Sequence, residues 1–176
     1  MKLAGKIVSV NINAKKGGRK FPVKEAIVNE EGIKGDGHSG NWHRQVSLLS
    51  YDSMLAFNEK AKNKAASLAN GTFVETVPGD FGENITTSGI DLKKLHTGDR
   101  LIFSGKAGSR ASQRRQGKED ISADGVILEV TQIGKECPAP CNIYRRVGSC
   151  IMPGKGIFCK VIRTGTIKCG DSIFIK

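Results

Sequence analysis

The sequence is short of aromatic residues and of long apolar runs. Phe, Trp and Tyr make up only 6% of its 176 residues. No segment approaches the roughly 20 consecutive apolar residues that a membrane-spanning helix needs. Residues 1–11 also lack the continuous apolar stretch of a secretory signal peptide. These absences argue against a membrane protein and predict a cytoplasmic one.

The shortage of cysteine pairs limits the metal and disulfide chemistry of the chain. Its five cysteines are an odd number, and without an export signal we expect reduced thiols. Structural zinc sites use two C-x2-4-C pairs, whereas only Cys137 and Cys141 have such a spacing. His38 and His43 do not have a recognised metal-binding spacing either. A structural zinc site therefore stays a minor alternative.

Acidic residues are also in short supply. There are 17 Asp and Glu against 28 Lys and Arg, which gives a net charge of +11. A surface of this charge attracts anions, and nucleic acid, a phosphate-bearing cofactor and an acidic partner all fit. Aromatic residues interleaved with the basic ones are lacking, so nucleic-acid binding is disfavoured.

Glycine, by contrast, is abundant. There are 22 glycines, and the short apolar runs are broken by Gly, Asp or Asn, which is typical of a mainly β domain with many turns. The length predicts one domain over residues 1–176. Strands are expected at 5–13, 21–29, 45–49, 125–133 and 156–162, the first two as a hairpin. One helix is expected within 50–70, with an apolar stripe of Met54, Leu55, Phe57, Ala61, Ala65 and Leu68.

Two Gly-Asp turns and one insertion complete the fold prediction. Gly98-Asp99 and Gly170-Asp171 each stand before an apolar segment, which predicts two strands that open from tight turns and pair in a barrel. Residues 104–123 are basic and nearly free of apolar side chains. They predict an exposed low-complexity loop, either a disordered insertion or a tether for an anionic partner.

Two glycine-rich stretches carry candidate binding residues. Residues 31–50 place Asp36 and His38 among four glycines and continue into Arg44-Gln45, on a loop that leads into a buried strand. The fork of Arg44 suits a phosphate or carboxylate, although an ion pair with a nearby acid is equally compatible. In Gly82-Glu83-Asn84, the polar side chains can orient Arg44 or a ligand, or simply satisfy the loop backbone.

The stretch 137–159 holds four of the five cysteines. Cys159 alternates with apolar residues and is expected in the core. Cys141 follows Ala139-Pro140 and precedes Arg145-Arg146, and nearby positive charge favours a thiolate, the species that attacks or ligates. Cys137 and Cys150 share this neighbourhood. The stretch can hold a soft metal, carry sulfur or form ordinary strands.

Several of these motifs occur together, and in this order, in a known family. The runs GIKGDGHSGNWHRQVSLLS, GDFGENIT, LHTGDRL and VILEVTQIGKECPAPCNIYRRVGSCIMPGKGIFCKVIRTGTIKCGD resemble the MOSC family. That family comprises the C-terminal domain of eukaryotic molybdenum cofactor sulfurases and small stand-alone bacterial proteins. The resemblance implies a compact, mostly antiparallel β-barrel with a few helices.

The resemblance also implies a ligand and a set of site residues. MOSC proteins are associated with molybdenum cofactor (molybdopterin), and a cysteine in the C-terminal half carries sulfur or ligates molybdenum. The Pro-Cys motif resembles Pro140-Cys141, so that role passes to Cys141, with Cys137 and Cys150 as alternates. The pterin-facing segments are similar to those that hold the remaining predicted binding residues: Asp36, His38, Arg44, Gln45, Glu83 and Asn84, with Arg145 and Arg146 as added positive charge.

The chain departs from the family in two ways. Residues 104–123 lengthen a connection that is usually short. No aminotransferase-like domain is present, so this chain alone is not expected to bind pyridoxal phosphate. Expected partners are molybdopterin or its precursors, and a molybdenum enzyme, a cysteine desulfurase or an electron-donor protein.

Three functions follow from these predictions. The leading one is sulfur transfer or molybdenum-dependent redox chemistry, since some MOSC proteins reduce N-hydroxylated compounds with an electron donor. The second is a non-catalytic carrier or scaffold in cofactor assembly. The third is a basic nucleic-acid-binding domain.

Overall fold

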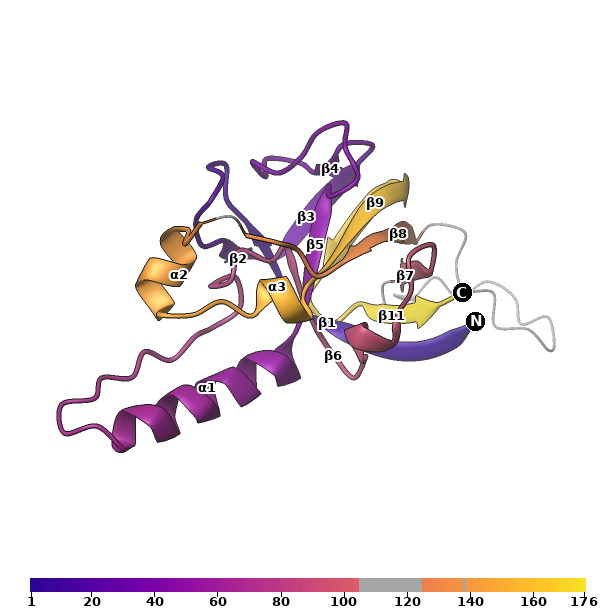
Figure 1. Cartoon of the computed structure of the whole chain (residues 1–176). Helices are drawn as coiled ribbons and strands as arrows, with labels where there is room; N and C mark the ends of the chain where they lie inside the picture. The colour runs from indigo at the N-terminus through magenta and orange to yellow at the C-terminus, as the bar shows by residue number, and fades with distance from the viewer. Residues whose placement is uncertain (105–124, 138) are drawn as a thin grey trace.

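A computed structural model describes residues 1–104, 125–137 and 139–176. Its main feature is a closed barrel of 7 strands, in which β11 pairs with both β7 and β1 (Figure 1). The pairing of β5 with β6 is parallel and the other described pairings around the barrel are antiparallel. The mainly β barrel is therefore confirmed. Around the barrel the strands are β1 (Lys2–Ile12), β6 (Ile85–Ser88), β5 (Val46–Ser50), β9 (Ile157–Arg163), β8 (Val126–Ile133), β7 (Arg100–Ser104) and β11 (Ser172–Ile175).

The segment predicted as one strand at 21–29 is two strands. The first, β2 (Phe21–Val23), pairs with β1 and so forms the expected hairpin. The second, β3 (Glu25–Asn29), joins β4 (Gly32–Ile33) and β10 (Gly165–Lys168) in a separate sheet. The single-strand prediction was wrong because the chain changes sheets at Lys24, which belongs to neither strand.

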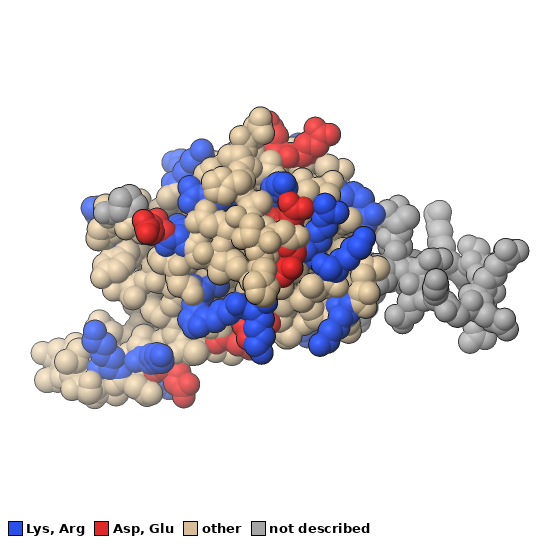
Figure 2. Space-filling model, turned by 45° about the vertical axis from the view of Figure 1, so that its right-hand side comes forward, with Lys and Arg blue, Asp and Glu red and all other residues tan. Residues whose placement is uncertain are grey.

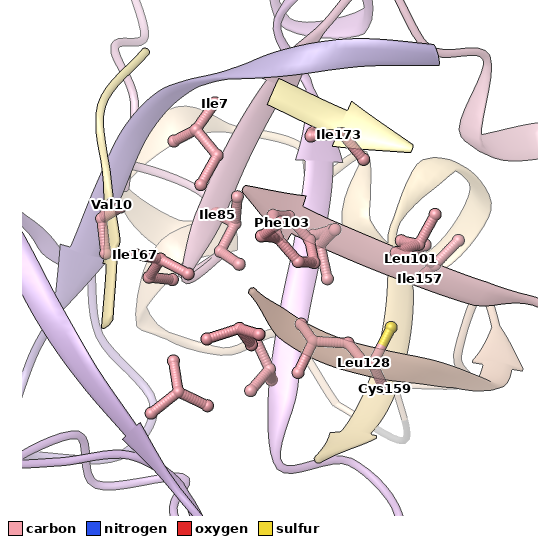
Figure 3. Close-up of a cluster of buried hydrophobic side chains, with 14 of the residues drawn as sticks. Ile7, Val10, Ile85, Leu101, Phe103, Leu128, Ile157, Cys159, Ile167 and Ile173 are labelled. Carbon is pink, nitrogen blue, oxygen red and sulfur yellow. The ribbon is translucent and has the colours of Figure 1, made fainter. Parts of the chain in front are cut away.

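The core fills the inside of the barrel (Figure 3). Strand β8 shows how: Val126, Leu128 and Val130 are fully buried, while the residues between them are half-buried. Cys159 lies in this core with no exposed surface, as predicted, and burial raises the pKa of its thiol. Cys159 is therefore a packing residue.

The two Gly-Asp turns have the same construction. In each, the aspartate side chain accepts a hydrogen bond from a backbone N–H three residues earlier, from His96 to Asp99 at 2.8 Å and from Lys168 to Asp171 at 2.9 Å. The intervening glycines have φ values of 97° and 88°, which L side chains rarely adopt. The strands that follow, β7 and β11, pair with each other, so this prediction is confirmed.

Helix α1 (Tyr51–Ala66) begins after Ser50, as expected, and ends before 70 because the backbone N–H and hydroxyl of Ser67 bond to the last turn. It extends away from the barrel (Figure 1), and its buried residues are Met54 and Asn58. Leu55 and Leu68 are 45% and 57% exposed, so that part of the predicted stripe was wrong.

Three short helices were not predicted: η1 (Leu92–Lys94), α2 (Asn142–Val147) and α3 (Met152–Lys155). Figure 1 shows α2 and α3 on the same side of the barrel as α1. No helix in the described part of the chain is long and apolar enough to cross a membrane. The basic loop predicted at 104–123 lies, apart from Ser104, outside the described residues.

Candidate functional site

The glycine-rich loop and the cysteine stretch meet at one cavity of about 160 Å³, which we call the Arg44 pocket. Its walls come from the loops before β2, β5 and β6 and from the segment around α2 and α3. Residues more than 90 positions apart, such as Arg44 and Cys141, therefore line the same space. The lining residues are Gly17, Gly18, His38, Trp42, Arg44, Ser47, Phe81, Gly82, Lys135, Cys141, Ile143, Met152 and Phe158.

Arg44 is held in this pocket by aromatic rings. Its guanidinium carbon lies 4.9 Å from the ring centroid of Trp42 and 5.8 Å from that of Phe158. These cation–π contacts orient the side chain without neutralising its charge. Among the described residues no acid forms an ion pair with Arg44, and its buried Nε has no hydrogen-bond partner. The arrangement leaves a positive, under-satisfied donor group on the pocket wall.

Cys141 stands directly before α2 and is half-buried. It lines the Arg44 pocket and also a neighbouring cavity of about 310 Å³, which we call the cysteine cavity. The exposed Cys137 and the half-buried Cys150 line that second cavity as well. Burial raises the pKa of the Cys150 thiol. Cys141 can thus be reached from two sides and has two further thiols near it.

All five cysteines are free thiols. The described residues contain no group of three or more His, Cys, Asp or Glu side chains placed to hold a metal ion. The minor alternative of a structural zinc site therefore has no support from this part of the chain.

Asp36 lies behind the pocket wall in a buried ion pair that the sequence analysis missed. Both of its oxygens are 2.5 Å from Nζ of Lys20, and they accept hydrogen bonds from the backbone N–H groups of Asn13 and His38. Burial by itself raises the pKa of Asp36. The hydrogen bond from His38, with the positive charge and hydrogen bond of Lys20, outweighs burial and holds the pKa of Asp36 well below its usual range. Asp36 is thus an internal anchor, unavailable to a ligand as placed.

His38 connects this ion pair to the pocket. Its Nδ1 lies 3.2 Å from Nζ of Lys20, and its ring lines the cavity. The ring also stacks on Trp42, with 6.5 Å between centroids. The Lys20–Asp36 pair therefore positions His38, which in turn supports the ring that holds Arg44.

Glu83 and Asn84 are buried beside the pocket floor. One carboxylate oxygen of Glu83 accepts from the Gly79 N–H at 2.7 Å and from the Thr86 hydroxyl at 2.8 Å, while the other has no partner among the described residues. Burial raises the pKa of Glu83 to about 6. The side-chain oxygen of Asn84 accepts from the N–H and hydroxyl of Ser47, each at 3.1 Å. Neither side chain lines the cavity.

The side chain of Gln45 is likewise occupied by hydrogen bonds to the backbone of the protein. Its amide nitrogen donates to the carbonyls of Glu30 and Gly40, and its amide oxygen accepts from the Val161 N–H. It fastens the glycine-rich loop to β9. Any effect of Gln45 on a ligand would act through the position of that loop.

The two arginines of α2 lie outside the pocket. Arg146 pairs with Asp80 at 2.9 Å and donates to its carbonyl, which ties α2 to the loop before β6. Arg145 is exposed. The pocket contains another cation, Lys135, which sequence reasoning did not select because it carries no motif.

The surplus positive charge is divided among several places. On the face shown in Figure 2, Lys and Arg side chains form separate groups, some of which have acidic side chains next to them. Among the residues drawn in colour, that face has no single continuous basic surface of the kind expected for nucleic acid.

Comparison with known proteins decides the family. A model of the MOSC domain matches residues 35–174. The chain belongs to the MOSC domain family. The resemblance seen in the sequence is therefore confirmed. The matched region of this MOSC domain includes Arg44 and Cys141, whereas Lys20 precedes it.

Solved structures share the fold of this MOSC domain at low identity. The YuaD protein from Bacillus subtilis is 19% identical with a TM-score of 0.66, over 97% of this chain and 94% of that one. YiiM from Escherichia coli is 17% identical, with a TM-score of 0.60 over 98% and 69%. YiiM from Geobacillus stearothermophilus is 16% identical, with a TM-score of 0.63 over 98% and 75%. No curated protein matches the chain.

Proposed function

We propose that this MOSC protein binds molybdenum cofactor in the Arg44 pocket and uses Cys141 as a sulfur ligand to molybdenum or as a persulfide carrier. The observation that carries the proposal is that one cavity is lined both by a thiol and by a guanidinium whose Nε has no hydrogen-bond partner among the described residues. Family membership supports the choice of cofactor.

The residues of the pocket fit the chemistry of that group. Molybdopterin carries a phosphate and a dithiolene, so its site needs positive charge and a soft ligand. Arg44 and Lys135 supply charge, and the buried Nε of Arg44 is a donor without a partner among the described residues. Cys141 supplies the soft ligand. Trp42 and Phe158 offer flat surfaces beside them.

The size of the space limits how the cofactor can bind. The Arg44 pocket, at about 160 Å³, is smaller than the roughly 300–1,000 Å³ of a usual ligand site. It suits one end of the cofactor, and the cysteine cavity on the other side of Cys141 provides adjoining space of about 310 Å³. When bound, the cofactor would supply molybdenum for sulfur exchange or redox chemistry. The chain's own part is to bind its anionic groups and to present Cys141.

Cysteine substitution tests the role of Cys141. Protein produced with molybdate in a cofactor-making host should contain molybdenum and pterin. Cys141→Ala should lose most of the molybdenum, because it removes the one thiol that lines the Arg44 pocket among the described residues, and a thiolate is a much stronger ligand than the thioether of Met152. Metal analysis, with pterin fluorescence after oxidation, provides the measurement.

Cys169→Ala is the matched control, because Cys169 is an exposed thiol that lines neither cavity. Its molybdenum content should equal that of the wild type. Equal metal in both variants would refute the role of Cys141 as ligand. Absence of pterin from the wild type would refute cofactor binding itself.

A further inference from the structure

A third cavity, of about 550 Å³ and larger than the two described above, opens between α1, η1 and α3. We call it the lysine cavity. One wall is the face of α1 that carries Ser53, Ala56, Phe57 and Lys60, which are spaced as neighbours on one side of a helix. The remaining lining residues are Ser50, Asp52, Gly89, Ile90, Asp91, Leu92, Lys93, Ile151 and Lys155.

Three lysines from three separate segments converge on this cavity: Lys60, Lys93 and Lys155. In the described part of the chain, none of them forms an ion pair with an acid. The neighbouring Lys93 side chain, followed by burial and the charge of Lys60, lowers the pKa of Lys155. Like charges gathered in this way repel one another unless an anion lies between them.

The two acids on the cavity wall do not balance these charges. Asp91 accepts a hydrogen bond from the Lys93 N–H and lies 3.5 Å from Nζ of Lys94, which is outside the cavity. Asp52 stands in the first turn of α1, where a negative charge already favours the helix. Among the described residues, the carboxylate of Asp52 is thus the one left without an ion pair or hydrogen bond to face the three lysines.

The rest of the cavity is partly apolar. Phe57, Ile90, Leu92 and Ile151 give it an apolar surface, and the hydroxyls of serine side chains add donors. A site with an apolar wall and a positive rim is complementary to a molecule that has an apolar body and an anionic group. Its volume of about 550 Å³ falls within the usual range for small ligands.

We propose that the lysine cavity binds a phosphate-bearing small molecule with an aromatic or apolar body. The site is distinct from the Arg44 pocket. A packed cluster separates them, in which Phe57 of the lysine cavity meets Phe81 of the Arg44 pocket edge to face, with centroids 5.1 Å apart. The proposal therefore does not depend on molybdenum cofactor binding.

Calorimetric titration with adenosine monophosphate tests this site, with adenosine and inorganic phosphate as the two halves of the probe. The nucleotide should bind more tightly than either half. The triple variant K60Q/K93Q/K155Q should weaken its binding about tenfold, the sum expected for three exposed charge contacts. Ala56→Trp, which fills the cavity without changing its charge, should also weaken it.

The matched control is K34Q/K62Q/K64Q, which removes the same charge from exposed lysines outside the cavity. It should bind the nucleotide as the wild type does, and both triple variants should keep the wild-type melting temperature. If both triple variants weakened nucleotide binding equally, the effect would come from net charge alone, and the proposal would be overturned. Failure of the wild-type protein to bind the nucleotide, or equal binding of adenosine, would overturn it as well.

Discussion

Glu83 shows how much a single buried carboxyl can affect this protein. Burial raises its pKa to about 6, so folding favours the neutral carboxyl over the carboxylate relative to the unfolded chain. When the pKa of a group is higher in the folded chain than in the unfolded chain, its contribution to the free energy of unfolding is fully present below the unfolded pKa. That contribution is lost as the pH rises through about 6.

Replacement of Glu83 by glutamine should therefore stabilise the protein at pH 8 but not at pH 4. The expected gain in the free energy of unfolding at pH 8 is about 2 kcal/mol, because burial raises the pKa of Glu83 from its ordinary value to about 6. Urea unfolding of both proteins at the two pH values measures it. A gain of the same size at both pH values would contradict the assignment of the effect to ionisation.

The buried pair of Lys20 and Asp36 makes a second prediction at this scale. Lys20→Met leaves the carboxylate of Asp36 without its cation and should cost about 3–5 kcal/mol in unfolding free energy. Lys24→Met, at an exposed neighbouring position, should cost less than about 0.5 kcal/mol. Chemical denaturation measures the free energy of unfolding of both variants. A comparable loss of stability in both would contradict the stabilising role of the Lys20–Asp36 ion pair.

Residue type alone does not show which way a polar side chain faces. The sequence analysis selected Asp36, Gln45, Glu83 and Asn84 together with Arg44, because all of them stand in or next to glycine-rich segments that resemble the pterin-facing segments of the MOSC family. The structure commits the first four to internal contacts and leaves Arg44 on the cavity wall. The distinction depends on partners such as Lys20, Val161 and Ser47, which are distant in sequence or carry no motif.

At the scale of elements, α1 illustrates the difference between forming a helix and packing one. The apolar spacing predicted the helix correctly. It did not predict which apolar side chains pack against neighbours, because only the part of α1 near the barrel is packed against the rest of the chain (Figure 1). Leu55 satisfies the pattern yet is 45% exposed, next to the fully buried Met54.

Alanine substitution of these two adjacent residues measures that difference. Met54→Ala should cost about 2–5 kcal/mol, since it opens a cavity in the cluster that includes Phe81 and Met152. Leu55→Ala should cost less than about 1 kcal/mol, since little apolar surface is uncovered and alanine favours the helix. Similar losses from both variants would show that α1 packs differently from the structure described.

At the scale of the whole molecule, the turn motifs were the most useful sequence signals for predicting where strands begin. The Gly-Asp pairs placed the starts of β7 and β11, and the alternation in 125–133 placed β8. The change of sheet at Lys24 and the parallel pairing of β5 with β6 have no local pattern in the sequence, so neither could be predicted from it. The meeting of Arg44 with Cys141 likewise results from barrel closure and helix placement. No local pattern predicts it, and the expectation that both belong to one site came from the resemblance to the MOSC family.

The central claim is that the Arg44 pocket binds the anionic part of molybdenum cofactor. Its most direct test is the affinity of purified protein for molybdopterin, measured by pterin fluorescence in wild type, Arg44→Gln and Arg100→Gln. Arg100 is exposed on β7, pairs with Glu129 and does not line the pocket. Arg100→Gln is therefore the control, since it removes the same charge as Arg44→Gln at a site outside the pocket.

Arg44→Gln should bind molybdopterin about tenfold to a hundredfold more weakly, as expected for the loss of charge-assisted hydrogen bonds. Arg100→Gln should bind it as the wild type does. Equal affinity of the Arg44→Gln and wild-type proteins would contradict the account.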